Sequence, residues 1–235
     1  MGPRTAVLIH GIMGDSRTWQ RVGADLVERG FRVLTVDLAG HGKSPRARRY
    51  SPRSWAEDVV ETVEPLLSAP PDIVMGHSLG ALVASLVADL MTPRTAIYID
   101  PAFAFPRGAI GVVYKVGWLL TPRPNRSILV RMNPGWDAAD VEAELAALRE
   151  WDRRTLFGFA DTRPLAPPAT LVAPSLVVLA ERSLLITARA AEAMITLGMS
   201  VTTVPGTGHA VFRDDHAGFM SKVDEFLAKA LPAPL

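Results

Sequence analysis

The segment Gly76-His77-Ser78-Leu79-Gly80 places a serine between glycines at the spacing of a nucleophile held in a tight turn. The apolar run Ile73 to Met75 precedes this G-x-S-x-G pattern and a helical pattern follows it, which is the context that the motif requires. Glycines on both sides allow a sharp strand-to-helix turn that side chains would block. The pattern predicts Ser78 as a nucleophile, and the alternative is a glycine turn with an incidental serine.

A serine hydroxyl needs a base that removes its proton, and histidine commonly does this. His209 follows the last predicted strand, so its loop can carry the imidazole over Ser78; the alternative role of His209 is to order that loop. The chain has no cysteine, which excludes a thiolate nucleophile, disulfides and thiolate metal ligands. A serine and a histidine are therefore the candidate reacting pair.

The other four histidines are expected to have structural roles. His10 and His77 adjoin strand ends and are expected to shape turns through ring hydrogen bonds. His41, in a glycine turn, and His216, near a helix start, are expected at solvated or capping positions.

Attack on an ester-like carbonyl creates an oxyanion, which backbone N–H groups aimed at it can stabilise. Leu79 N–H, at the amino end of the helix after the nucleophile, is one candidate donor. The loop His10-Gly11-Ile12-Met13-Gly14 offers Ile12 N–H as the second. The alternative for this loop is a glycine turn into a helix capped by Asp15 or Ser16.

Six short apolar runs separated by helical patterns predict the elements that position these residues. The predicted strands are residues 6–9, 31–36, 73–75, 96–99, 175–179 and 201–204, and the predicted helices are about 19–29, 52–67, 78–90, 188–197 and 217–230. Uninterrupted apolar strands indicate a mostly parallel sheet with helices on both faces, the doubly wound α/β class. The first and third strands are expected side by side where the winding reverses, so that the loops at Ile12 and Ser78 face one crevice.

Residues 101–170 show no strand pattern and predict a helical insertion after the fourth strand. Residues 1–100 and 171–235 then form the core. One clear helix, Asp140 to Trp151, places Val141, Leu145 and Leu148 on one face together with Trp151.

The insertion is rich in aromatic and basic side chains. It holds half of the chain's sixteen aromatics: Phe103, Phe105, Tyr114, Trp118, Trp136, Trp151, Phe157 and Phe159. These residues predict an apolar pocket wall or, alternatively, the packing of a small subdomain onto the sheet. Between Asp100 and Asp137 the chain has five basic residues, Arg107, Lys115, Arg123, Arg126 and Arg131, and no acidic one. They indicate attraction of an anionic substrate or membrane surface, or a solvated face.

These motifs make the sequence similar to serine hydrolases of the α/β-hydrolase fold. The segment from Asp37 to Ser44 adds to the likeness, because it resembles the family's D-x-x-G-x-G-x-S turn, which Asp37 is expected to brace. The motifs span nearly the whole chain in family order. The resemblance implies a nucleophile at Ser78, a base at His209, a lid made from the insertion, and no cofactor or metal. The first two antiparallel strands of the usual fold are missing from the predicted elements.

The triad acid departs from the family pattern. The family usually carries it in a G-x-x-D arrangement after the strand that corresponds to residues 175–179, where this sequence has Ala180-Glu181-Arg182-Ser183. A serine cannot stabilise the imidazolium that forms on the base. Asp100, at the end of the fourth predicted strand, is the first substitute, because some members carry the acid there; its alternative role is capping a turn. Glu181 is the second candidate, and a site without an acid is the third possibility.

Composition limits the classes of partner. The 25 basic and 24 acidic residues leave a net charge of +1, so no chain-wide basic excess favours a nucleic acid. With 49% hydrophobic residues the chain can bury a core. No apolar run has the length of a secretory signal or a membrane span, which predicts a cytoplasmic protein. The oligomeric state is not predicted.

The expected function is hydrolysis of an ester, thioester or lactone with a hydrophobic acyl part, and the expected partner is a small-molecule substrate. Two alternatives remain open. One is a non-hydrolytic enzyme of the same fold, such as a lyase or a cofactor-free oxygenase. The other is a receptor-like protein that uses the same site to bind a ligand.

Overall fold

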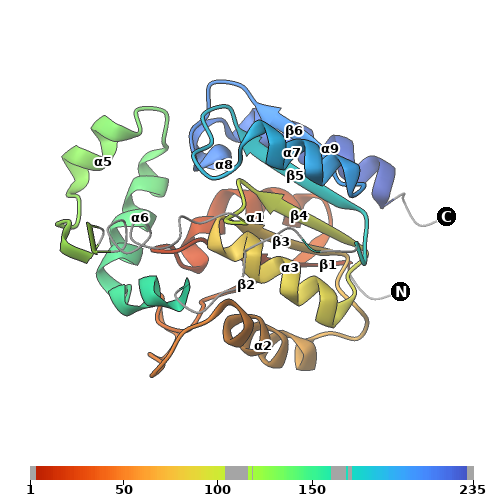
Figure 1. Cartoon of the computed structure of the whole chain (residues 1–235), viewed down its shortest axis with the longest axis horizontal. Coiled ribbons are helices and arrows are strands. Elements are labelled where there is room, and N and C mark those ends of the chain that lie inside the picture. The colour runs from red at the N-terminus through yellow and green to blue at the C-terminus, as the bar shows by residue number, and fades with distance from the viewer. Residues whose placement is uncertain (1–3, 104–115, 118, 160–167, 169–170, 232–235) are drawn as a thin grey trace.

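A six-stranded sheet forms the centre of the computed structural model, which describes residues 4–103, 116–117, 119–159, 168 and 171–231 (Figure 1). The strands lie in the order β2-β1-β3-β4-β5-β6, and every neighbouring pair is parallel. Their bounds are β1 Arg4–Ile9, β2 Phe31–Val36, β3 Ile73–His77, β4 Thr95–Ile99, β5 Ser175–Ala180 and β6 Ser200–Val204. All six predicted strands and the parallel α/β class are confirmed, as is the adjacency of the first and third strands.

Helices cover both faces of the sheet. One face packs against α2 (Pro52–Val63), α3 (Leu79–Met91) and α7 (Ala188–Thr196), and the other against α1 (Gln20–Glu28), α8 (Val211–Asp214) and α9 (His216–Ala230). β3, β4 and β5 are buried along their whole length because both faces are covered, which explains their uninterrupted apolar sequence. The described residues also include three short 3-10 helices: η1 Ser16–Trp19, η2 Glu64–Leu66 and η3 Arg153–Phe159.

The start of α2 follows from local sequence. The Ser51 side chain accepts a hydrogen bond from Ser54 N–H, and the Ser54 hydroxyl accepts one from Ser51 N–H, which makes a capping box. Pro52 occupies the first helical position, where a backbone N–H has no partner within the helix, so a residue without an N–H costs no hydrogen bond there. The predicted start of this helix is confirmed, and it brings Trp55 under the loop after β2.

Two helices of the segment between β4 and β5 stand apart from the sheet (Figure 1): α5, Arg126–Met132, and α6, Ala138–Glu150. We call them the insertion helices. They have a small core of their own, made of Leu129, Val141, Leu148, Trp151 and Leu156. Ile12 and Met13, in the loop after β1, pack against this core. The insertion helices therefore lie over the loop that the sequence predicts to hold the oxyanion.

The predicted helix at 140–151 is confirmed, with its apolar face in the insertion core. α5 is not among the predicted elements, because seven residues are too few to show a helical period. Phe105, Tyr114, Trp118, Arg107 and Lys115 lie outside the described residues, as does the side chain of Phe159. The aromatic pocket wall and the basic surface stay predictions, as does the division of the chain into core and lid.

None of the helices within the described ranges is long and apolar enough to cross a membrane.

Candidate active site

The turn from β3 into α3 holds Ser78 in a backbone conformation that serine seldom adopts, with φ 53° and ψ −116°. Its glycine neighbours leave no room for side chains. A Cβ on Gly76 would lie 2.1 Å from Gly80 O, and a Cβ on Gly80 would lie 2.1 Å from Ile9 O. Ser78 N–H donates to Ile99 O of β4 at 2.9 Å. The two glycines thus allow α3 to cross tightly behind β1 and β3, which presents Ser78 at the end of the sheet.

Asp100 and His209 lie together although 109 positions separate them in the sequence. Asp100 Oδ2 is 2.5 Å from His209 Nδ1. Asp100 is fully buried directly after β4, and its N–H donates to Val178 O of β5 at 2.8 Å. A carboxylate only accepts hydrogen bonds, so the proton between the two groups is on Nδ1, and a neutral ring then has its lone pair on Nε2. This is the tautomer that a histidine needs to act as a base through Nε2.

His77 fixes the main chain of His209. Its Nε2 lies 2.9 Å from His209 O, and the two ring centroids are 4.6 Å apart. Burial, followed by the nearby His209, holds the pKa of His77 well below its ordinary value. A neutral ring with its proton on Nε2 donates to that carbonyl. His77 has the turn-shaping role that its position predicts.

The loop after β1 lies against the serine. A Cβ on Gly11 would be 3.2 Å from Ser78 Cβ, and Gly14 N–H closes a turn onto Gly11 O at 3.1 Å. His10 anchors this loop, because its Nδ1 lies 2.7 Å from Gly11 O and its Nε2 accepts from Leu38 N–H at 3.0 Å. Burial lowers the pKa of His10, as this pattern of one donor and one acceptor requires.

Ile12 and Leu79 flank Ser78 from two elements. Ile12 lies in the turn after β1, and Leu79 is the first residue of α3, where N–H groups have no partner within the helix. Asp15 caps η1 by accepting from Arg17 N–H, so the loop also has the capped turn considered as its alternative.

The loop after β5 uses its polar side chains locally. Glu181 Oε2 accepts from Gly206 N–H at 3.0 Å. Ser183 Oγ, at the position of the usual family acid, accepts from Leu185 N–H and Ile186 N–H. Glu181 therefore holds the turn before His209, whereas Asp100 contacts the His209 ring itself.

Of the two remaining expectations for histidines, one is wrong. His41 is fully buried rather than solvated, because the rings of His10 and Trp55 enclose it, and burial together with His10 lowers its pKa to about 3. His216 begins α9 and makes a capping contact, because its Nδ1 lies 3.2 Å from Phe212 O of α8. Its Nε2 lies 2.7 Å from Asp25 Oδ2 and so also ties α9 to α1.

Asp37 braces its turn as expected. Its two carboxylate oxygens accept from Ser16 N–H at 2.7 Å and from Lys43 N–H at 2.9 Å. Burial alone would raise the pKa of Asp37, but these hydrogen bonds outweigh it and hold the pKa below its ordinary value.

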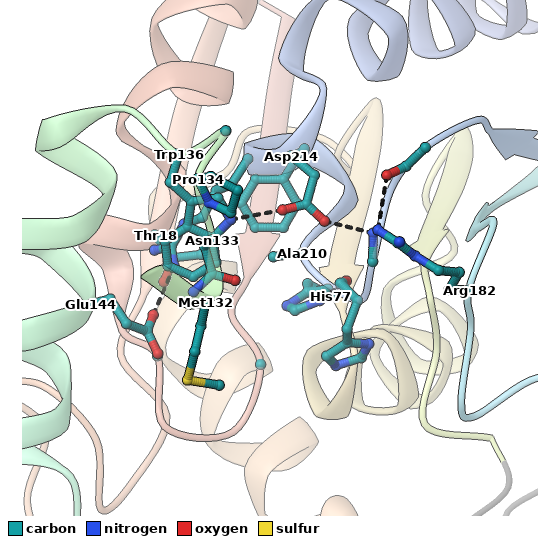
Figure 2. A pocket seen from close by; sticks show the side chains of 18 residues that line it. Thr18, His77, Met132, Asn133, Pro134, Trp136, Glu144, Arg182, Ala210 and Asp214 are labelled. Carbon is teal, nitrogen blue, oxygen red and sulfur yellow. Dashed lines mark hydrogen bonds and ion pairs between the residues drawn. The ribbon is translucent and has the colours of Figure 1, made fainter. Parts of the chain in front are cut away.

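A cleft of about 400 Å³ adjoins His209 (Figure 2). The core lines it with Gly11, His77 and His209, and the connection between α5 and α6 lines it with Met132 to Trp136. The cleft thus lies between the insertion helices and the end of the sheet. Trp136, Arg213 and Asp214 line it too, although no local motif marks them in the sequence.

Fold and geometry together define a parallel α/β protein with a serine on a strand-to-helix turn and a histidine–aspartate pair near it. The model of the alpha/beta hydrolase family matches residues 6–221. The chain belongs to this family.

Individual relatives match more limited parts of the sequence. The mouse (Mus musculus) sn-1-specific diacylglycerol lipase ABHD11 is 32% identical over 110 residues, which cover 45% of this chain and 36% of that protein. Lipase LipV of Mycobacterium tuberculosis (strain ATCC 25618 / H37Rv) is 34% identical over 109 residues, which cover 44% of this chain and 39% of that protein. The matches thus span about two fifths or less of these curated relatives.

Solved structures resemble the whole chain. E-2-(acetamidomethylene)succinate hydrolase has a TM-score of 0.78 at 21% identity and covers 97% of this chain and 92% of its own. A thermophilic esterase from Thermogutta terrifontis has a TM-score of 0.76 at 20% identity and covers 97% and 90%. At these identities the likeness is one of fold.

Proposed function

We propose that this protein is a serine hydrolase that cleaves an ester, thioester or lactone with a hydrophobic acyl part. The observation that carries the proposal is the contact of 2.5 Å between His209 Nδ1 and Asp100 Oδ2, at the edge of the sheet where the β3–α3 turn presents Ser78. Lipases among the sequence relatives and an esterase among the similar structures agree with this reaction class.

The reaction has two halves. Ser78 Oγ attacks the substrate carbonyl carbon while His209 Nε2 takes the hydroxyl proton, and Asp100 stabilises the imidazolium that forms. Ile12 N–H and Leu79 N–H donate to the oxyanion. His209 then returns the proton to the leaving group, and an acyl-enzyme remains on Ser78. Water, activated by His209, releases the acid and restores the serine.

Asp100 is the proposed acid because it touches the imidazole, whereas Glu181 is engaged at Gly206 N–H. The buried setting of Asp100 also supports this role. Asp100 is fully buried and the His209 side chain is 46% exposed, so water screens the pair from the side of the histidine only. No cofactor takes part in these steps.

The proposed substrate is a small molecule whose acyl part lies under the insertion helices, which act as a lid. Met132, Pro134 and Trp136 give the cleft an apolar wall. Polar groups on Asn133 and Thr18 line the same cleft, and they can orient a substrate without a charge of their own.

A fluorophosphonate probe and a series of p-nitrophenyl esters test the proposal. The folded wild-type protein should react with the probe and hydrolyse the esters, and Ser78→Ala and His209→Gln should each remove both activities. Ser221→Ala, at an exposed serine on α9, is the matched control and should retain both. Wild-type protein that neither takes the label nor cleaves any ester would contradict a hydrolase.

A further inference from the structure

One carboxylate bridges the loop of the proposed base and the insertion helices. Asp214 Oδ2 accepts from Gly208 N–H at 2.6 Å, and Gly208 immediately precedes His209. Asp214 Oδ1 accepts from Trp136 Nε1–H at 2.8 Å, in the connection between α5 and α6. Figure 2 shows Asp214 and Trp136 next to each other at the cleft. Both carboxylate oxygens of Asp214 therefore accept a hydrogen bond, one from the loop that carries His209 and one from the connection between α5 and α6.

The core holds this carboxylate in place. Asp214 ends α8, where its N–H donates to Ala210 O at 3.0 Å. Val211 and Phe212 of the same turn are buried, and the Phe212 ring packs on Trp19 and against His77. Because α8 is anchored in the core, Asp214 sets the position of its two donors.

Trp136 is fixed by a second contact with the same turn. The Arg213 guanidinium lies 4.6 Å from the centre of a Trp136 ring and is almost completely buried. Arg213 Nη1 donates to Glu144 Oε2 of α6 at 2.7 Å, and its Nε lies 3.7 Å from Asp140 Oδ1 of the same helix. Arg213 and Asp214 of α8 thus anchor the insertion helices through an ion pair with α6, a cation–π contact with Trp136 and a hydrogen bond to it.

We propose that Asp214 is a positioning residue for His209 and that it makes the placement of this base depend on Trp136. The inference rests on the proposed function, in which His209 is the base. Asp214 fixes the backbone immediately before His209, and His77 fixes the carbonyl of His209 itself. With both ends of the residue held, the imidazole meets Asp100 through Nδ1.

Steady-state kinetics test this role. Asp214→Asn keeps the size of the side chain but turns an NH₂ group toward one of two N–H donors, so the loop must shift. Since a misplacement of about 1 Å can cost about 100-fold in rate, we expect kcat to fall about 10- to 100-fold with KM nearly unchanged. Asp214→Glu, which keeps both acceptor oxygens, should recover much of the loss. Asp215→Asn is the matched control, because Asp215 only caps α9 through Gly218 N–H and asparagine caps equally well.

A double-mutant cycle tests the dependence on Trp136. Trp136→Phe removes the N–H that Asp214 accepts, together with part of the ring on which Arg213 packs, and we expect a several-fold lower kcat. In the Asp214→Asn background the same change should have a clearly smaller effect, because the hydrogen bond is already broken and only the packing is lost. Additive losses would overturn the coupling, and a wild-type kcat in Asp214→Asn would overturn the positioning role.

A spectroscopic readout separates this inference from the proposed function. The proton on His209 Nδ1, in its short hydrogen bond to Asp100, should give a low-field ¹H resonance that is lost in Asp100→Asn. In Asp214→Asn this signal should move or broaden, and in Asp215→Asn it should stay. An unmoved signal in folded Asp214→Asn overturns the inference even if the protein hydrolyses no ester. Failure of Ser78 to take the label overturns the hydrolase alone.

Discussion

Asp100 combines two features that rarely occur together in one residue. Its φ of +36° lies in the left-handed region that favours glycine, and its carboxylate is completely buried. Such a backbone costs of the order of 1–3 kcal/mol and persists only where the surroundings over-determine it. Here the Val178 carbonyl and the His209 ring hold the residue from both sides. The strain is the physical reason to expect more than a turn cap at this position.

Asp100→Asn should therefore lower kcat by about 10⁴, because the amide can stabilise the wrong imidazole tautomer and not the imidazolium. Glu181→Gln retains an oxygen that accepts from Gly206 N–H and should stay within a few-fold of wild type. Both values come from ester hydrolysis at saturating substrate. A wild-type rate in Asp100→Asn, or a loss of similar size in Glu181→Gln, would contradict the assignment of Asp100 as the triad acid.

The sequence predicts the residues that local patterns mark. Ser78 and its glycines form a contiguous motif, and His209 and Asp100 each follow a predicted strand, so parallel strands bring their loops to one edge. Trp136 and Asp214 have no such mark. Their hydrogen bond joins positions 78 residues apart, and only the packing of the insertion on α8 brings them together.

At the level of elements, the approach of α3 to β1 determines where Ser78 and the loop after β1 meet. Gly80→Ala would place a methyl group 2.1 Å from Ile9 O, and a backbone oxygen cannot turn away. We expect a loss of about 1–3 kcal/mol or more in the free energy of unfolding, measured in urea, together with a lower kcat.

Gly23→Ala in α1 is the matched control for this substitution. A Cβ there would lie 3.7 Å from Val33 Cγ1, which is an ordinary contact, and alanine in a helix is favoured over glycine by up to about 1 kcal/mol. This variant should be as stable as wild type or more so. Equal stability of the two alanine variants would contradict close packing of α3 on β1.

The length of an element decides whether the sequence predicts it. Each strand is a short apolar run between turn residues, and the long helices show a period, so their positions agree with the structure to within a few residues. α8 and α5, with four and seven residues, are defined by what they pack against rather than by a repeating pattern.

Across the whole molecule, buried neutral histidines connect stability to pH. His41 stays unprotonated in the folded protein until about pH 3, whereas the unfolded chain takes up this proton near the ordinary pKa of 6.5. Between these values the unfolded state binds more protons, so the free energy of unfolding decreases as the pH falls. Burial lowers the pKa of His10 and of His77 in the same direction.

Urea unfolding at pH 7, 6 and 5 measures this dependence. A histidine that stays unprotonated in the folded protein over this range, as His41 does, contributes about 1.4 kcal/mol of lost stability per pH unit below 6.5. Glutamine at position 41 cannot titrate. As the pH is lowered, the free energy of unfolding of His41→Gln should therefore fall by about 1.4 kcal/mol less per pH unit than that of the wild type. Parallel curves for the two proteins would show that His41 takes up its proton in the folded state as readily as in the unfolded chain.

β4 and β5 are neighbours in the sheet, although a long segment separates them in the sequence. The border between these two strands therefore divides the sheet into a part before this segment and a part after it. Ser78 and Asp100 belong to the part before this border, and His209 belongs to the part after it. A polypeptide cleaved between the two strands would yield two fragments, each with an incomplete set of reacting groups. Turnover would then appear only when the fragments reassemble along this border, and the protein could serve as a split reporter of association.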